Sequence, residues 1–183
     1  MGQHCCPWWM NYLIGNPLRL LMQPPDKLFG HLVQSGMCVL DAGCGMGVFT
    51  LALAEMAGAD GQVVAVDIDG RNLKTLERKA RRKGLGNRIT TVACDMGELP
   101  LVQRFDFALA ANSVHEVPEF PRFFQRLNLL LNPGARFLLL EPSHHLGKEG
   151  FQRELELASD AGLEVIERPT VRSSLAALLQ KAV

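Results

Sequence analysis

The fold is decided by the stretch Val39-Leu40-Asp41-Ala42-Gly43-Cys44-Gly45-Met46-Gly47. An apolar run at residues 38–40 leads into it, and a helical pattern at residues 48–56 follows it. A strand that passes through a glycine-rich turn directly into a helix is typical of open α/β sheets, in which ligands bind at the carboxyl ends of strands. Glycines allow a tight turn there and a close approach of the backbone to a ligand. The stretch therefore predicts a nucleotide-like ligand at the end of the first strand.

Strand and helix patterns alternate along the chain beyond this loop. Apolar runs of strand length cover residues 38–40, 63–66, 89–92, 105–109 and 136–140. Between them, apolar residues recur at helix spacing, as in the stripe formed by Phe120, Phe123, Phe124, Leu127, Leu130 and Leu131. This alternation predicts an α/β fold that is doubly wound, with a mostly parallel sheet and helices on both faces.

The last part of the chain departs from the alternation. Residues 163–167 have the pattern of a sixth strand, and residues 174–179 have that of a seventh strand or a helix. The connection between them, residues 168–173, is too short for a crossover helix. If residues 174–179 form a strand, that strand must therefore pair antiparallel with its neighbour.

Length and composition fit a single globular unit. The chain has 183 residues, of which 48% are hydrophobic and 21% are charged, enough for one substantial core. Residues 1–36, rich in proline and aromatic side chains, are expected to form a helical lead-in or cap with a helix near residues 26–33. Residues 37–183 are expected to form the ligand-binding domain. The 19 basic and 19 acidic side chains balance, which argues against a nucleic-acid partner.

The cysteines indicate the compartment. There are five, an odd number, and no C-x-x-C pair occurs, a pattern typical of reduced thiols in a cytoplasmic protein. The first residues lack the features of a secretory signal or a membrane span. They also depart from the acylation pattern, because Cys6 stands where serine or threonine is required. We therefore expect a cytoplasmic protein without a membrane anchor, as a monomer or a homodimer.

Charge indicates which ligand the glycine loop suits. The dinucleotide fingerprint G-x-G-x-x-G has Val48 where its third glycine should stand. Asp41 precedes the glycines, and its carboxylate would repel a pyrophosphate. S-adenosylmethionine has no phosphate and carries two cations, a sulfonium and an ammonium, which a carboxylate attracts. The loop therefore favours S-adenosylmethionine over NAD.

Acidic residues also follow the next two predicted strands. Asp67 ends the second strand about 20 residues beyond the glycines, where a carboxylate can accept hydrogen bonds from ribose hydroxyls. Asp69 is a weaker candidate for the same role. Asp95 follows the third strand, where it can accept from an adenine amino group, with Met96 or Ile68 packing on the ring.

Together these motifs resemble those of class I S-adenosylmethionine-dependent methyltransferases. Residues 39–47 are similar to the first motif of that family, Val66-Asp67 to its ribose-binding motif, and Cys94-Asp95-Met96 to its adenine-site motif. The resemblance covers Met37 to the C-terminus and implies seven strands with an antiparallel seventh, so that residues 174–179 form a strand. It implies a site for S-adenosylmethionine that includes Asp41, Gly43, Cys44, Gly45, Gly47, Asp67, Ile68, Asp95, Met96 and Asn112.

The segment after the fourth strand borders the methyl site in that family. Residues 112–116 lack the Asn-Pro-Pro-Tyr type of motif found in nucleic-acid and protein amine methyltransferases, and they look more like small-molecule methyltransferases. His115 is a candidate base or acceptor-orienting group, and the alternative is a histidine with a structural role in the cleft wall. Asn112 is a candidate contact of cofactor or acceptor. Glu141 and His144, after the fifth strand, are expected near the acceptor.

Other interpretations remain open at this stage. Two adjacent histidines, His144 and His145, suggest a metal, but neighbours in an extended chain point to opposite sides, so no metal is expected. The basic cluster at residues 78–83 is interpreted as a solvated helix end, stabilised by the helix dipole. A small-molecule methyltransferase is the leading function. The alternatives are an RNA or protein methyltransferase, a non-catalytic S-adenosylmethionine-binding module, and a nicotinamide-dependent oxidoreductase, which Asp41 and Val48 disfavour.

Overall fold

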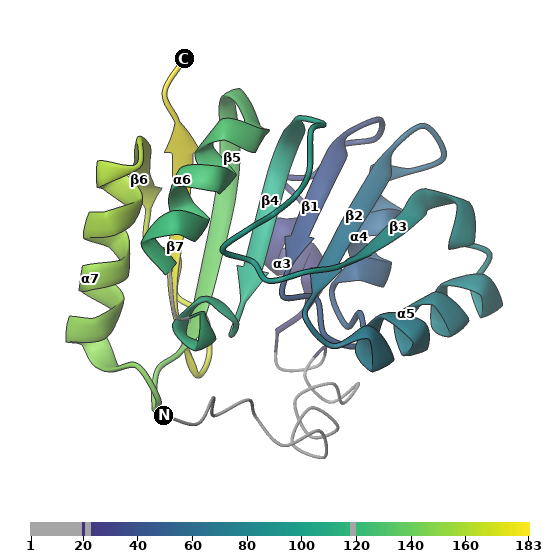
Figure 1. Ribbon diagram of the computed structural model, residues 1–183, viewed down its shortest axis with the longest axis horizontal. Coiled ribbons are helices and arrows are strands. Elements are labelled where there is room, and N and C mark those ends of the chain that lie inside the picture. Colours follow the sequence, from purple (N-terminus) through teal and green to yellow (C-terminus); the bar gives the residue numbers. More distant parts are fainter. Residues whose placement is uncertain (1–19, 21–22, 118–119) are drawn as a thin grey trace.

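One seven-stranded sheet organises the molecule (Figure 1). The computed structural model describes residue 20, residues 23–117 and residues 120–183. Most of the lead-in predicted for residues 1–36 thus lies outside the described residues. The strands are β1 (Cys38–Ala42), β2 (Gln62–Asp67), β3 (Ile89–Ala93), β4 (Phe105–Ala111), β5 (Leu131–Pro142), β6 (Leu163–Glu167) and β7 (Ser174–Lys181), in the spatial order β3-β2-β1-β4-β5-β7-β6.

The strand directions match the prediction. β1 pairs parallel with β2 and β4, and the parallel set extends to β3 and β5. β7 lies between β5 and β6 and pairs antiparallel with both. Residues 168–173 are too short a connection to cross the sheet, so the chain reverses there. The expected mostly parallel sheet with an antiparallel last strand is therefore confirmed.

Helices cover both faces of the sheet. They are α3 (Pro25–Phe29), α4 (Thr50–Ala57), α5 (Gly70–Arg82), α6 (Phe120–Leu130) and α7 (Gly147–Asp160), with short 3₁₀ helices η1 (Gly86–Arg88) and η2 (Val114–Glu116). Val64 and Val66 of β2 pack with the core beneath α6 and α7, whereas Val63 and Ala65 point to the side of α4 and α5. None of the helices in the described ranges has the length and apolar character needed to cross a membrane.

Two element boundaries differ from the predicted ones by about four residues or more. The helix expected over residues 26–33 ends at Phe29, and Leu32 and Val33 instead close a turn by donating to the Phe29 carbonyl. Their burial explains the apolar spacing that suggested a longer helix. β5 begins at Leu131 instead of residue 136, because Leu131 already pairs with Phe105 ahead of an irregularity in the ladder.

Candidate functional site

The carboxyl ends of five parallel strands meet at one edge of the sheet. Asp67 at the end of β2 lies in register with Ala93 at the end of β3, and Ala111 of β4 lies opposite Leu140 of β5. The residues that follow these strands are therefore neighbours across the edge. The predicted acids, the glycine loop and the segment after β4 come together there.

The glycine loop is tightly packed except at its middle glycine. A Cβ on Gly43 would lie 2.3 Å from the Ser113 Cβ, and one on Gly47 would lie 2.3 Å from the Leu76 Cδ1. Gly45, with a φ of 54°, has no such neighbour within 4 Å. Gly43 and Gly47 thus allow the loop to pack, whereas Gly45 faces open space that a ligand can enter.

Four N–H groups of this loop are used within the protein. Gly43 and Cys44 both donate to the Val66 carbonyl, at 2.8 and 2.9 Å, and Gly47 donates to the Cys44 carbonyl at 3.0 Å. Gly45 donates to Asp67 Oδ2 at 2.8 Å. Loops that bind phosphate point free backbone N–H groups at the anion. Because these four groups are occupied, the loop is poorly suited to a pyrophosphate.

Asp67 joins the end of β2 to the loop. Besides the bond from Gly45, its Oδ1 accepts from the backbone N of Asp69 at 2.8 Å and from Asn72 Nδ2 at 3.1 Å. The next residue, Ile68, is 62% exposed, whereas isoleucine is usually buried. A carboxylate beside an exposed apolar side chain fits a ribose joined to a flat base. Asp69 instead caps α5, since its side chain accepts from the Arg71 N.

Asp41 and Cys44, two of the predicted cofactor residues, have buried side chains. Asp41 is 3% exposed, and its Oδ2 accepts a hydrogen bond of 2.5 Å from Thr50 Oγ1 at the start of α4. Cys44 is also buried. Burial, together with the charges of Asp41 and Asp67, raises the pKa of the Cys44 thiol well above its usual value, so the thiol stays protonated and unreactive. Both side chains thus lie in positions that support the loop from beneath.

The residues after β3 pack against the same loop. Asp95 is half-buried, and its Oδ1 accepts from the Gly97 N at 2.7 Å. Met96 is buried, and its Sδ lies 3.1 Å from the point that a Cβ on Gly43 would occupy. Met96 of the predicted adenine site therefore packs against the glycine loop.

Asn112, directly after β4, has an unusual conformation and an unsatisfied oxygen. Its φ is 58°, and its N donates to the Leu140 carbonyl at 2.7 Å. Its Oδ1 is buried and has no hydrogen-bond partner among the described residues. Such an oxygen costs about 1–3 kcal/mol unless a partner arrives. An ammonium group on a ligand would satisfy it.

His115 is held by a buried carboxylate. Its Nδ1 donates to Glu141 Oε2, and Glu141 Oε1 accepts from the Val114 N at 3.0 Å. Glu141 is fully buried, whereas the His115 side chain is 18% exposed. Burial lowers the pKa of His115, but the hydrogen bond and the charge of Glu141 raise it, and the net pKa lies above the usual value. With Nδ1 donating, Nε2 is left to accept a proton.

The His115 ring also lies close to two other imidazoles, those of His144 and His145. The ring centroid of His145 is 6.2 Å from that of His115 and 4.9 Å from that of His144. His144 and His145 occupy a turn, so the assumption of an extended chain with opposed side chains is wrong. Within the described ranges, no group of three or more histidine, cysteine or acidic side chains has a metal-binding arrangement.

Three residues of this region escaped the sequence prediction. Asn72 donates to Asp67, and Lys79 Nζ donates to the Met46 carbonyl of the glycine loop at 3.0 Å. Lys79 is half-buried and its pKa is lowered by burial. The interpretation of residues 78–83 as a solvated helix end is therefore wrong for Lys79. The third residue is Glu154 of α7, which is 2% exposed. The sequence signal that could have identified these residues is a charged or amide side chain at a position within the apolar stripe of a helix.

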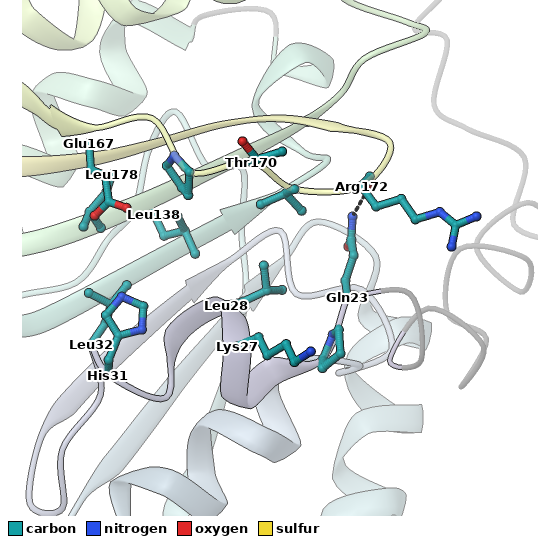
Figure 2. A pocket seen from close by; sticks show the side chains of 13 residues that line it. Gln23, Lys27, Leu28, His31, Leu32, Leu138, Glu167, Thr170, Arg172 and Leu178 are labelled. Carbon is teal, nitrogen blue, oxygen red and sulfur yellow. Dashed lines mark hydrogen bonds between the residues drawn. The ribbon is translucent and has the colours of Figure 1, made fainter.

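Figure 2 shows a cavity elsewhere, on the sheet face that α3 covers. It has a volume of about 270 Å³ and lies between Leu32 on one side and Leu138 and Leu178 of the sheet on the other. At its rim, Gln23 Nε2 donates to the Arg172 carbonyl at 3.1 Å. None of the predicted site residues lines this cavity. The sheet edge, where the predicted residues converge, is the better candidate site.

Comparison with known proteins adds a family. A model described as a methyltransferase domain matches residues 33–168. A demethylmenaquinone methyltransferase of Geobacillus kaustophilus is 30% identical over 112 residues, which are 61% of this chain and 47% of that protein. A 2-phytyl-1,4-naphtoquinone methyltransferase of Nostoc punctiforme is 33% identical over 109 residues, 59% of this chain and 47% of that protein. The chain thus spans about half the length of these relatives.

Solved structures share the whole architecture. A SAM-dependent methyltransferase from Aquifex aeolicus superposes with a TM-score of 0.86 at 22% identity, over 96% of this chain and 99% of that one. A putative S-adenosyl-L-methionine-dependent methyltransferase from Methanococcus maripaludis gives a TM-score of 0.80 at 14% identity, over 100% of this chain and 98% of that one. At these identities the likeness establishes the fold.

Proposed function

Because the chain belongs to the methyltransferase domain family, we propose that it transfers a methyl group from S-adenosylmethionine to a small-molecule acceptor. One observation carries the proposal: the sheet edge offers hydrogen-bond acceptors, while four N–H groups of the glycine loop are occupied. The acceptors are the carboxylates of Asp67 and Asp95 and the unsatisfied oxygen of Asn112. A ligand with two cations and two ribose hydroxyls suits such a surface, and a pyrophosphate does not.

The cofactor would lie along the loop. Asp67 already accepts three hydrogen bonds, but an ionised carboxylate has about four lone-pair sites, so it can also accept from a ribose hydroxyl. Ile68 offers an exposed apolar side chain to the adenine ring, Met96 packs beside the glycine loop, and Asp95 offers an acceptor for the amino group of adenine. Asn112 Oδ1 would receive the ammonium group. When bound, S-adenosylmethionine supplies a methyl group that its positive sulfur makes reactive.

His115 and Glu141 give the site a base. Since Nδ1 of His115 donates to Glu141, the partly exposed ring can use Nε2 to take a proton from an acceptor that arrives with an ionisable O–H. Reduced quinones carry such a group. Because the relatives from Geobacillus and Nostoc are named for quinone substrates, reduced demethylmenaquinone is the first acceptor to test. A cytoplasmic location and a monomeric or homodimeric state remain predictions from the sequence.

Calorimetric titration tests the cofactor assignment. We expect S-adenosylmethionine and its demethylated product, S-adenosylhomocysteine, to bind, and NAD to give no heat of binding. Binding of NAD without a response to the other two would contradict the proposal. Formation of S-adenosylhomocysteine would then be followed with reduced demethylmenaquinone and a panel of phenolic acceptors. Binding of S-adenosylmethionine without methylation of any acceptor would favour the non-catalytic module.

Replacing Gly45 with alanine should weaken S-adenosylmethionine binding by about tenfold or more while leaving the protein folded. The new methyl group would enter the open space beside the loop, and the positive φ would cost about 1 kcal/mol of stability. Gly84→Ala is the matched control, because Gly84 has a φ of 72° and equally open surroundings at the end of α5. Calorimetry measures the affinity for S-adenosylmethionine, and thermal melting measures the stability of each variant. If Gly45→Ala and Gly84→Ala lose the same stability and bind the ligand with the same affinity, the ligand lies away from Gly45.

A further inference from the structure

Helix α5 concentrates the positive charge of the chain. Residues 70–83 hold seven of the 19 basic side chains and a single acidic one, Glu77, although the whole chain is balanced. Five of the seven are exposed and recur every three or four residues, which places them on the outer face of the helix, opposite the buried Leu73 and Leu76. These five side chains form the basic stripe: Arg71, Lys74, Arg78, Arg81 and Arg82.

Part of the charge of the basic stripe is not neutralised within the protein. Two of its members pair with acids, Asp69 and Glu77, at 2.7 and 3.5 Å. The other three, Lys74, Arg78 and Arg82, form no ion pair in the described ranges. A surface with excess positive charge attracts anionic partners and raises their local concentration. The basic stripe therefore indicates a partner with a negatively charged surface.

An open groove lies beside the basic stripe, between α5 and α4, with a volume of about 910 Å³. Arg82 belongs to both the stripe and the groove, and Lys79 and Lys83 line the same side. Two acids also line the groove, Asp26 and Glu55, and the carboxylate of Glu55 accepts from Lys83 Nζ at 2.9 Å. The aliphatic part of the lining comes from α4 and the turn before it, and its members are half-buried: Val48, Leu51, Ala52 and Met56.

Helix α4 is apolar on its outer face as well as on its inner one. Leu53, Ala54 and Ala57 are buried against the core. On the outer side, Glu55 is the one charged residue of the helix. A helix at the surface of a globular protein normally has a polar outer face. The exposed apolar side of α4 therefore suits a partner that offers apolar contact next to negative charge.

A membrane offers both kinds of contact. Stable attachment to a bilayer commonly combines electrostatic attraction to anionic lipids with burial of apolar side chains. A single-stranded nucleic acid is instead bound by basic groups together with aromatic side chains that stack on its bases, and no aromatic side chain of the described ranges lines the groove. We propose that the basic stripe and the groove form a peripheral docking surface for a membrane that carries anionic phospholipids. The docking needs neither the methyl donor nor the acceptor and thus goes beyond the proposed function.

Sedimentation of the full chain with lipid vesicles tests the electrostatic part. The wild type should bind vesicles of phosphatidylcholine and phosphatidylglycerol and should not bind phosphatidylcholine alone. Lys74→Glu/Arg78→Glu should weaken binding by about 25-fold or more, because each basic side chain near an anionic bilayer contributes a factor of about five. Lys148→Glu/Arg153→Glu makes the same charge change at exposed positions of α7, at the other end of the molecule (Figure 1). This control should bind within about twofold of the wild type at physiological ionic strength, where distant charges are screened.

Met56→Gln tests the apolar part. The new side chain has nearly the same length but adds a polar amide to the groove, so binding to the anionic vesicles should weaken by about threefold or more. Thermal melting should change little, because Met56 is only half-buried. Leu129→Gln is the matched control, since Leu129 is 59% exposed on α6, and its vesicle binding should equal that of the wild type.

Several results would overturn the proposal. One is equal sedimentation with and without phosphatidylglycerol, and another is wild-type binding by Lys74→Glu/Arg78→Glu. If Met56→Gln loses stability but keeps its vesicle binding, the groove is covered by the protein itself or by a second copy. If single-stranded RNA displaces the vesicles, and its binding is lost in Lys74→Glu/Arg78→Glu but kept in Met56→Gln, the partner is a nucleic acid. Calorimetry with S-adenosylmethionine without vesicles tests the proposed function separately, so the two proposals can fail independently.

Discussion

Replacing His115 with glutamine should lower the turnover number by about 100- to 10 000-fold, the usual effect of losing a general base. Glutamine is of similar size and can still donate a hydrogen bond to Glu141, so η2 should keep its place. It cannot take a proton from an acceptor. Binding of S-adenosylmethionine should change by no more than about twofold, because the cofactor contacts proposed for Asp67 and Asn112 remain. Release of S-adenosylhomocysteine and calorimetry measure the two effects.

The pH dependence of turnover provides a second test of the role of His115. A base works in its deprotonated form, so turnover should rise as pH increases through the pKa of His115, which lies above the usual 6.5. His145→Gln is the control, since this ring stacks beside His115 and is exposed. A His115→Gln enzyme that keeps about half of the wild-type turnover would show that the histidine only lines the cleft wall.

Replacing Asp67 with alanine should weaken S-adenosylmethionine binding by about 30- to 100-fold. Hydrogen bonds to charged groups contribute about 1.5–3 kcal/mol each, and a loss of about 2–2.7 kcal/mol corresponds to that change in affinity. The variant loses the proposed ribose contact and also leaves the Gly45 N without its carboxylate. Asp67→Asn should have a smaller effect, because the amide oxygen can replace one of the two carboxylate oxygens.

Asp69 provides the matched control for this prediction. It lies two residues further on and caps α5 by accepting from the Arg71 N. Asp69→Ala should therefore cost about 1 kcal/mol of stability and leave the cofactor affinity unchanged. Calorimetry for affinity and denaturant unfolding for stability distinguish the two residues. If Asp69→Ala weakens S-adenosylmethionine binding more than Asp67→Ala does, the ribose contact has been assigned to the wrong acid.

Periodicity was sufficient to predict the layers of the fold. The inner strands of this sheet are largely buried on both faces and read as short apolar runs, while the helices show apolar stripes at 3.6-residue spacing. The family resemblance implied that residues 174–179 form a strand, and the shortness of their connection to β6 then required a reversal. The predicted end of α3 was wrong, because Leu32 and Val33 are buried although they lie in a turn beyond the helix.

The site was only partly predictable, for a different reason. Acids at strand ends can be placed from the sequence, because a parallel sheet brings those ends to one edge. The partners of those acids depend on tertiary contacts: Glu141 reaches η2 across 26 residues, and Lys79 reaches Met46 across 33. Glu154 did leave a signal, since it falls three residues after Phe151 on the face of α7 that also holds Leu155 and Ala158. A carboxylate at a core position is a reason to look for a charged neighbour.

The bonds within the glycine loop have a thermodynamic consequence. Four hydrogen bonds from N–H groups of the loop, the Thr50 bond to Asp41 and the Lys79 bond to Met46 hold the loop in one shape. The conformational entropy of the loop is therefore lost when the protein folds, and little of it remains to be lost when a ligand arrives. The receptor surface is preorganised, and its affinity depends on the contacts that the ligand itself makes.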